Sequence, residues 1–214
     1  MVNRRTGLFA GLAAVAALAV GVAAFTSPAT AGSGSETAKV GSKAPDFTLT
    51  DASGQEQSLS SYTGKGQVVV LEWFNAGCPF VVRHHEKYDT MADLAAKYKG
   101  KVTWLAINSS ASGKEGFGMD QEAMKKWSIA YPILIDADGG VGHMYGAKTT
   151  PHMFIIDAKG TLVYAGAIDN DPGDKKSPTE KVNYVAKALD EVLAGKPVTE
   201  SETKSYGCSV KYAK

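Results

Sequence analysis

The sequence of 214 residues contains two cysteines, Cys78 and Cys208, and these are its best candidates for chemistry. Cys78 follows an apolar run, residues 67–74, and stands directly before Pro79, where a helical pattern begins. Because proline favours the first position of a helix, Cys78 should be the N-cap, with free amides and the positive end of the helix dipole facing its sulfur. Such surroundings lower the pKa of a thiol and enrich its thiolate. The alternative is a buried, inert cysteine, but the strand–Cys–Pro–helix context favours the reactive interpretation.

Two further residues bear on this thiol. Arg83 lies in the same predicted helix and could add positive charge that lowers the thiol pKa. Cys208, on a tail expected to be flexible, could resolve a mixed disulfide or a sulfenic acid on Cys78. It could equally form a permanent disulfide, which over so long a loop would add about 4–5 kcal/mol of stability, or never meet Cys78. The catalytic interpretation requires that the Cys78 sulfur reach solvent.

The elements that position Cys78 follow from the hydrophobic pattern. Apolar strands flank a helix over 79–98, so this segment should be a βαβ unit with parallel strands and a right-handed crossover. A β-hairpin closed by Ala158-Lys159-Gly160 is expected later in the chain. The predicted strands are 67–74, 102–107, 131–136, 152–157 and 161–167, and the predicted helices are 79–98, 120–128, 138–147 and 179–193. This order predicts an α/β fold with a mixed central sheet and helices on both faces.

The chain divides into four segments. Residues 1–31 combine an early arginine pair, an apolar run and a final Ala29-Thr30-Ala31, which together predict a secretory signal peptide. Residues 32–40 should form a linker, 41–195 the folded domain, and 196–214 a polar tail that carries Cys208. An uncleaved anchor is less favoured, because the apolar run of 18 residues is barely long enough to span a bilayer. We expect export to the periplasm or an equivalent extracytoplasmic space, with no stable membrane anchor after cleavage.

Charge limits the partners of the mature chain. Removing residues 1–31 takes away two arginines and no acidic residue, which leaves 21 basic and 22 acidic side chains. Without a basic excess the chain cannot neutralise phosphates, so nucleic acid is set aside as a partner. Two cysteines suffice for one redox pair in a compartment that permits disulfides. Since the electrons of such a pair reside on sulfur, no organic cofactor is implied.

Four motifs in sequence order resemble the thioredoxin-like superfamily, and within it the redoxin branch. They are Gly41–Phe47 (GSKAPDF), Trp73–Pro79 (WFNAGCP), Thr149-Thr150-Pro151 and Phe154–Gly160 (FIIDAKG). The resemblance implies a thioredoxin-like fold and a cis-proline loop beside the reactive sulfur. In that family the loop positions substrate, so the resemblance assigns this role to Thr150 and Pro151. Trp73 and Phe74 are predicted to be either core residues or part of the active-site wall, where they would help to position substrate.

The sequence departs from the two best-known patterns of this superfamily. A dithiol thioredoxin has a second cysteine three positions after the first, where this chain has Val81. Peroxiredoxins place Thr or Ser three residues before their reactive cysteine and Pro seven before it, where this chain has Asn75 and Leu71. The chain is therefore most similar to a peroxiredoxin-like branch that keeps only the first active-site cysteine.

Three functions remain open from the sequence. The leading hypothesis is an exported thiol-disulfide or peroxide-linked oxidoreductase of the antioxidant type, with Cys78 as the nucleophile. Its partners would be a protein or small-molecule thiol, disulfide or peroxide and an unidentified reductant. The second is a non-catalytic binding module locked by a Cys78–Cys208 disulfide. The third is a copper-binding chaperone, but the adjacent His84 and His85 cannot share one helix face, so we assign no metal site and expect a solvated or partly packed pair.

Overall fold

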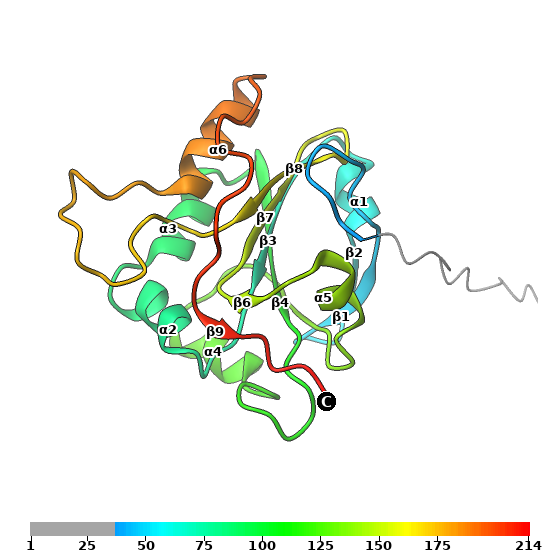
Figure 1. Cartoon of the computed structure of the whole chain (residues 1–214). Coiled ribbons are helices and arrows are strands. Elements are labelled where there is room, and N and C mark those ends of the chain that lie inside the picture. Colours follow the sequence, from blue (N-terminus) through cyan, green and yellow to red (C-terminus); the bar gives the residue numbers. More distant parts are fainter. Residues whose placement is uncertain (1–36) are drawn as a thin grey trace, which may run out of the picture. The chain divides into compact units, whose positions relative to one another are not determined.

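The computed structural model describes residues 37–214 (Figure 1). The expected signal peptide and most of the expected linker lie outside the described residues. The strands are β1 (Thr48–Asp51), β2 (Glu56–Ser58), β3 (Val68–Trp73), β4 (Val102–Asn108), β5 (Ile133–Ile135), β6 (Thr149–Thr150), β7 (Met153–Ile156), β8 (Leu162–Gly166) and β9 (Cys208–Ser209). Seven of them form one mixed sheet in the order β2-β1-β5-β4-β3-β7-β8, and β6 pairs with β9 in a separate two-stranded ribbon. The predicted α/β fold is confirmed.

Helices cover both faces of the seven-stranded sheet (Figure 1). They are α1 (Leu59–Thr63), α2 (Pro79–Glu86), α3 (Thr90–Lys97), α4 (Asp120–Lys126), α5 (Gly140–Tyr145) and α6 (Tyr184–Leu193). Apolar side chains of α2, α3, α4 and α6 pack on one face, and those of α1 and α5 pack on the other. Among residues 37–214, no helix has the length and apolar character needed to cross a bilayer.

Strand β3 is central, and every one of its residues is buried. Val68 and Val70 contribute to the core under α2, α3 and α6, whereas Val69 and Leu71 contribute to the core under α1 and α5. This alternation follows from the two-residue period of a strand. β3 pairs with β4 in parallel and with β7 in antiparallel register, so the predicted βαβ unit is confirmed. The arrangement brings the end of β3, and hence Cys78, to the edge formed by the carboxyl ends of these parallel strands.

Two predicted helices differ from the observed ones. The segment predicted as one helix over 79–98 is two helices, because Asp89 adopts a left-handed backbone conformation (φ 48°) that interrupts the helical hydrogen bonds. The last helix begins at Tyr184 rather than Thr179, since Asn183 caps it by accepting a hydrogen bond from the Ala186 amide. The short elements β2 and α1 carry too few periodic residues for the sequence pattern to show them.

Candidate functional site

The loop between β3 and α2 holds Cys78 through the side chain of Asn75. The Asn75 amide nitrogen donates to Ser110 Oγ (3.1 Å) and to the Glu115 carbonyl oxygen (2.9 Å), while its oxygen accepts from the Gly77 amide (2.7 Å). The Cys78 amide donates to the Asn75 carbonyl oxygen at 3.0 Å. The loop that carries the sulfur is therefore fixed to the polar segment after β4.

Cys78 is the N-cap of α2 and Pro79 begins the helix, as the sequence predicted. Burial raises the pKa of the Cys78 thiol. Hydrogen bonds from the Cys208 and Thr150 side chains and from the Val81 and Cys208 amides lower the pKa by more than burial raises it, so the pKa lies below its ordinary value. The Val81 amide faces the sulfur without forming a full capping hydrogen bond. The helix start thus contributes to the lowered pKa together with groups from two other segments.

Thr150 contacts Cys78 in two opposing ways. The Cys78 thiol donates to the Thr150 carbonyl oxygen at 2.9 Å, which favours the protonated form. The Thr150 hydroxyl lowers the thiol pKa, and within the described part of the chain it is buried without a hydrogen-bond partner. The Thr150–Pro151 peptide bond is cis, as the resemblance implied. The strand β6 therefore lies directly against the sulfur.

Cys208 reaches the same place from the C-terminal tail. β9 pairs antiparallel with β6, so that Thr150 faces Cys208 and Thr149 faces Ser209. Both cysteines are free thiols. Burial and the hydrogen bond to the Cys78 sulfur raise the pKa of Cys208 to about 12. The structure thus removes the alternative in which the cysteines never meet, and it leaves one thiol with a lowered pKa beside one with a raised pKa.

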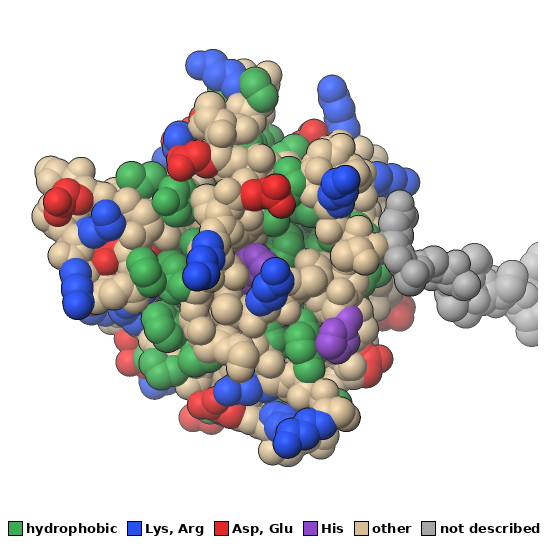
Figure 2. Space-filling model, in the orientation of Figure 1, with side chains coloured by type: hydrophobic (Ala, Val, Ile, Leu, Met, Phe, Trp, Pro, Cys, Tyr) green, Lys and Arg blue, Asp and Glu red, His purple; other side chains and the backbone are tan. Residues whose placement is uncertain are grey.

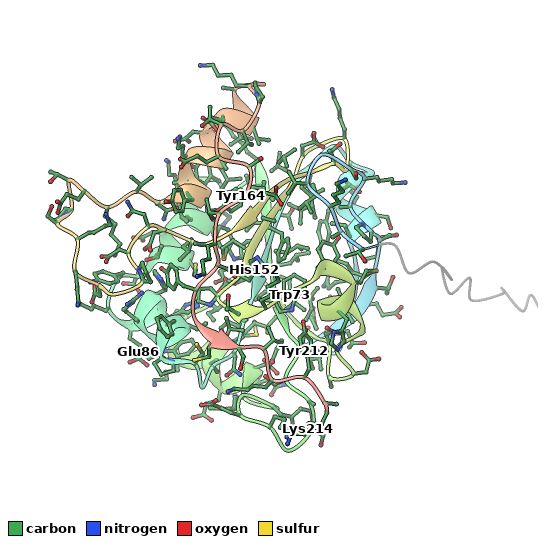
Figure 3. All side chains as sticks on the ribbon, in the orientation of Figure 1. Trp73, Glu86, His152, Tyr164, Tyr212 and Lys214 are labelled. Carbon is green, nitrogen blue, oxygen red and sulfur yellow. The ribbon has the colours of Figure 1, made fainter. Side chains whose placement is uncertain are left out.

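The tail is ordered rather than flexible, which corrects the expectation from its polar composition. Before Cys208, Thr203 Oγ1 accepts a hydrogen bond from the Ala167 amide (2.9 Å), and the Tyr206 hydroxyl donates to Asp169 Oδ1 (2.5 Å). After Cys208, the Tyr212 ring stacks on His143 and its hydroxyl donates to the Ala147 carbonyl oxygen (3.0 Å). The tail, red in Figure 1, crosses the face of the domain, and Tyr212 is labelled in Figure 3.

This path buries the reactive sulfur. Cys78 is 0% exposed, whereas Cys208 is partly exposed. The expectation that the Cys78 sulfur reaches solvent is therefore wrong for this conformation, because Cys208 and Tyr206 pack against the core cluster that contains Cys78. Figure 2 shows the covered face, with hydrophobic side chains gathered beside the tail over α2 and α3. An external reactant reaches Cys78 only after this part of the tail moves.

Three residues that the sequence assigned to the site lie apart from the sulfur or inside the core. Trp73 (Figure 3) is fully buried under α5, where its indole nitrogen donates to Ser109 Oγ (3.0 Å). Phe74 is also buried and packs edge-on against Trp127. Neither forms a substrate-facing wall; both support the loop that holds Cys78. The Arg83 guanidinium donates to the carbonyl oxygens of residues 171 and 172, so it is directed away from the thiol it was expected to tune.

A buried acid near the end of β3 was not predicted from the sequence pattern. Glu72 is 0% exposed and accepts hydrogen bonds from Trp104 Nε1 (2.8 Å) and the Tyr131 hydroxyl (3.1 Å). Its other oxygen lies 3.6 Å from His85 Nε2, and both of these atoms lack a hydrogen-bond partner among the described residues. The available signal was one acidic residue inside an otherwise apolar strand. A buried carboxylate of this kind needs such donors to offset its desolvation.

The two histidines are both buried, which corrects the expectation of a solvated or partly packed pair. His84 contacts Thr90 and Tyr206 at 3.1 Å each, and burial lowers its pKa to about 4. His85 stacks on Trp127 at a centroid distance of 4.8 Å. The adjacent rings point to different partners, as their helical spacing predicted. Over residues 37–214, no three His, Cys, Asp or Glu side chains are grouped so as to hold a metal ion.

The family of this chain is shown by a sequence comparison that covers most of the domain described above. The sequence model of the redoxin family matches residues 39–182, which is more than half of the chain. The chain belongs to the redoxin family. The match includes Cys78, Thr150 and Pro151, and it ends before Cys208. Cys208 therefore lies outside the matched region.

Individual relatives agree with this assignment. The redoxin is 35% identical over 124 residues to a protein named thiol-disulfide oxidoreductase ResA from Geobacillus kaustophilus, covering 58% of this chain and 66% of the relative, just under two thirds of its length. A crystal structure of a hypothetical protein from Sinorhizobium meliloti superposes with a TM-score of 0.72 at 30% identity, covering 83% of this chain and 96% of that one. A putative thiol:disulfide interchange protein DsbE from Chlorobium tepidum has a TM-score of 0.51 at 27% identity, covering 60% and 85%.

Proposed function

We propose that this redoxin is an exported thiol-disulfide oxidoreductase in which Cys78 attacks and Cys208 resolves. The observation that carries the proposal is the pairing of β9 with β6, which places Cys208 beside Cys78, where the pKa of Cys78 is lowered and that of Cys208 is raised. The names of the ResA and DsbE relatives support the reaction class. The signal-peptide pattern of residues 1–31 supports export, and Val81 supports assignment to a branch that keeps only the first active-site cysteine.

The exchange takes two steps. Cys78 thiolate attacks one sulfur of a substrate disulfide, forms a mixed disulfide and releases the other substrate sulfur as a thiolate, which takes up a proton from water. Cys208, after loss of its proton, then attacks the Cys78 sulfur and releases the second substrate thiolate. The substrate disulfide is reduced by two electrons, and the protein is left with a Cys78–Cys208 disulfide. An external dithiol returns this disulfide to two thiols.

A peroxide can use the same pair. Cys78 thiolate would take one oxygen from the peroxide, giving a sulfenic acid and an alcohol or water. Cys208 would then condense with the sulfenic acid, forming the same disulfide and releasing water. We place this activity second, because Asn75 and Leu71 occupy the positions where peroxiredoxins have Thr or Ser and Pro.

A second candidate is the non-catalytic binding module locked by a Cys78–Cys208 disulfide. The anchored tail and the full burial of Cys78 favour it. The two candidates differ in whether physiological dithiols open the bridge. A disulfide that persists in excess dithiothreitol under native conditions supports the module and contradicts the oxidoreductase.

Replacing Cys208 with serine should arrest the exchange at its intermediate. The attack of Cys208 on the mixed disulfide at Cys78 is intramolecular. Its loss should therefore slow release of the second substrate thiol by about 100-fold or more. Intact-mass spectrometry of Cys208→Ser, mixed with a peptide disulfide, should show one peptide attached to Cys78. Ser209→Ala, a change at the neighbouring exposed residue, should release peptide as the unmodified chain does. Equally fast release from Cys208→Ser would show that Cys208 does not resolve.

A further inference from the structure

The tail segment over Cys78 has the form of a bound peptide. Cys208 and Ser209 run as an extended strand along the edge of β6, in antiparallel register with Thr150 and Thr149. Cys208 pairs with Thr150, whose carbonyl oxygen contacts the Cys78 thiol, and it packs against the core cluster that contains Cys78. A substrate cysteine attacked by Cys78 must present its sulfur at the same point. We propose that residues 206–209 occupy the substrate-binding site when no substrate is bound. This site, formed by β6 and Cys78, accepts extended polypeptide segments in which the reactive cysteine follows a glycine.

The requirement for glycine comes from the backbone of β6. A Cβ atom added at Gly207 would lie 2.1 Å from the Thr150 carbonyl oxygen and 2.7 Å from the Thr150 carbonyl carbon. Gly207 also has a φ of 137°, which side chains rarely permit. The Thr150 carbonyl oxygen contacts the Cys78 thiol, so it cannot move away without disturbing that contact. Any peptide bound in the register of the tail meets the same obstacle.

The tail and the substrate are then alternative occupants of one site. With the tail seated, Cys78 is 0% exposed and no second peptide can pair with β6. With a substrate seated, Cys208 is displaced. The peptide must therefore leave β6 while it is still joined to Cys78 before the tail can return. Cys208 then attacks the Cys78 sulfur on the side opposite the peptide sulfur, and the peptide leaves as a thiolate. This inference rests on the proposed function and adds its substrate class.

Gly207→Ala tests the seating of the tail in the full chain. The added methyl group should detach β9, and iodoacetamide should label Cys78 at least about tenfold faster, a ratio that corresponds to about 1.4 kcal/mol. The matched control is Gly195→Ala, a glycine that also has a positive φ (70°) but has open space around its Cβ position. Both variants should keep the near-ultraviolet circular dichroism of the core. Cys78 labelling unchanged by Gly207→Ala in a folded protein would overturn the proposal.

A pair of peptides tests the substrate class even where that variant fails to fold. The probes carry the tail sequence Ser-Tyr-Gly-Cys-Ser-Val, or the same sequence with alanine for glycine, each with its cysteine in a mixed disulfide with thionitrobenzoate. Attack by Cys78 of the Cys208→Ser chain joins its sulfur to the peptide sulfur and releases coloured thionitrobenzoate. The glycine peptide should react at least about tenfold faster than the alanine peptide.

A small disulfide, cystamine, separates the two possible failures. Equal rates for the two peptides, with cystamine also reactive, would overturn the substrate class and leave the proposed oxidoreductase intact. A Cys78 that reacts with neither peptide nor with cystamine would overturn both. The faster reaction of the glycine peptide should disappear with Cys78→Ser, which would confirm that the preference depends on reaction at Cys78.

Discussion

Cys78→Ser is expected to reduce the rate of disulfide exchange by about a thousandfold or more. A serine hydroxyl is not ionised near neutral pH and cannot form a disulfide, so both steps of the exchange lose their central atom. The measurement is the release of thiol from a peptide disulfide in the presence of an external dithiol. The uncatalysed reaction with that dithiol sets the baseline.

The loss should not come from unfolding. Serine is a preferred N-cap residue, and its hydroxyl can donate to the Thr150 carbonyl oxygen in place of the thiol. The urea midpoint of Cys78→Ser should therefore stay close to that of the unmodified chain. Exchange that continues in the folded variant above the baseline would show that another residue is the nucleophile.

Trp73→Ala is expected to lower the free energy of unfolding by about 3–5 kcal/mol. The ring is 0% exposed and packs at centroid distances of 5.6 Å from Tyr145 and 5.1 Å from Phe154. Its removal leaves a cavity between β3 and α5 and takes the indole donor from Ser109. Urea unfolding measures the loss.

Phe117→Ala is the matched control, because this aromatic side chain is 43% exposed. Its substitution should change the free energy of unfolding by no more than about 0.5 kcal/mol. Similar losses for the two variants would contradict the assignment of Trp73 to the core. A large loss for Trp73 alone would support its role as a structural residue, in place of the substrate-positioning role that the sequence suggested.

Local sequence patterns were enough to predict the fold and the part of the site that holds Cys78. The apolar run that forms β3, the Cys78-Pro79 start of α2 and the hairpin of β7 and β8 are each encoded within a few neighbouring residues. The resemblance added the cis bond at Pro151. These features depend on hydrophobic periodicity and on proline geometry, both of which a single sequence displays.

The missed features depend on contacts between distant segments. The tail lacks periodicity because single side chains, Tyr206 and Tyr212, anchor it instead of an apolar face. The pairing of Cys208 with Thr150 joins residues 58 positions apart, and no local rule reports it. The Glu72–His85 contact likewise needs the packing of α2 on β3. Sequence spacing also could not show that the Arg83 guanidinium turns toward residues 171 and 172.

Thiolate absorbance against pH measures the lowered pKa of Cys78 directly, because it does not require a reagent to reach the buried sulfur. The difference between the unmodified chain and Cys78→Ser isolates one thiol. Because the pKa of Cys78 is lowered, its thiolate should form at a lower pH than the thiolate of an unstructured cysteine peptide titrated in the same buffer. Cys208, with its pKa raised to about 12, should remain protonated throughout that range. A midpoint for Cys78 at or above that of the unstructured peptide would contradict the proposed role of Cys78.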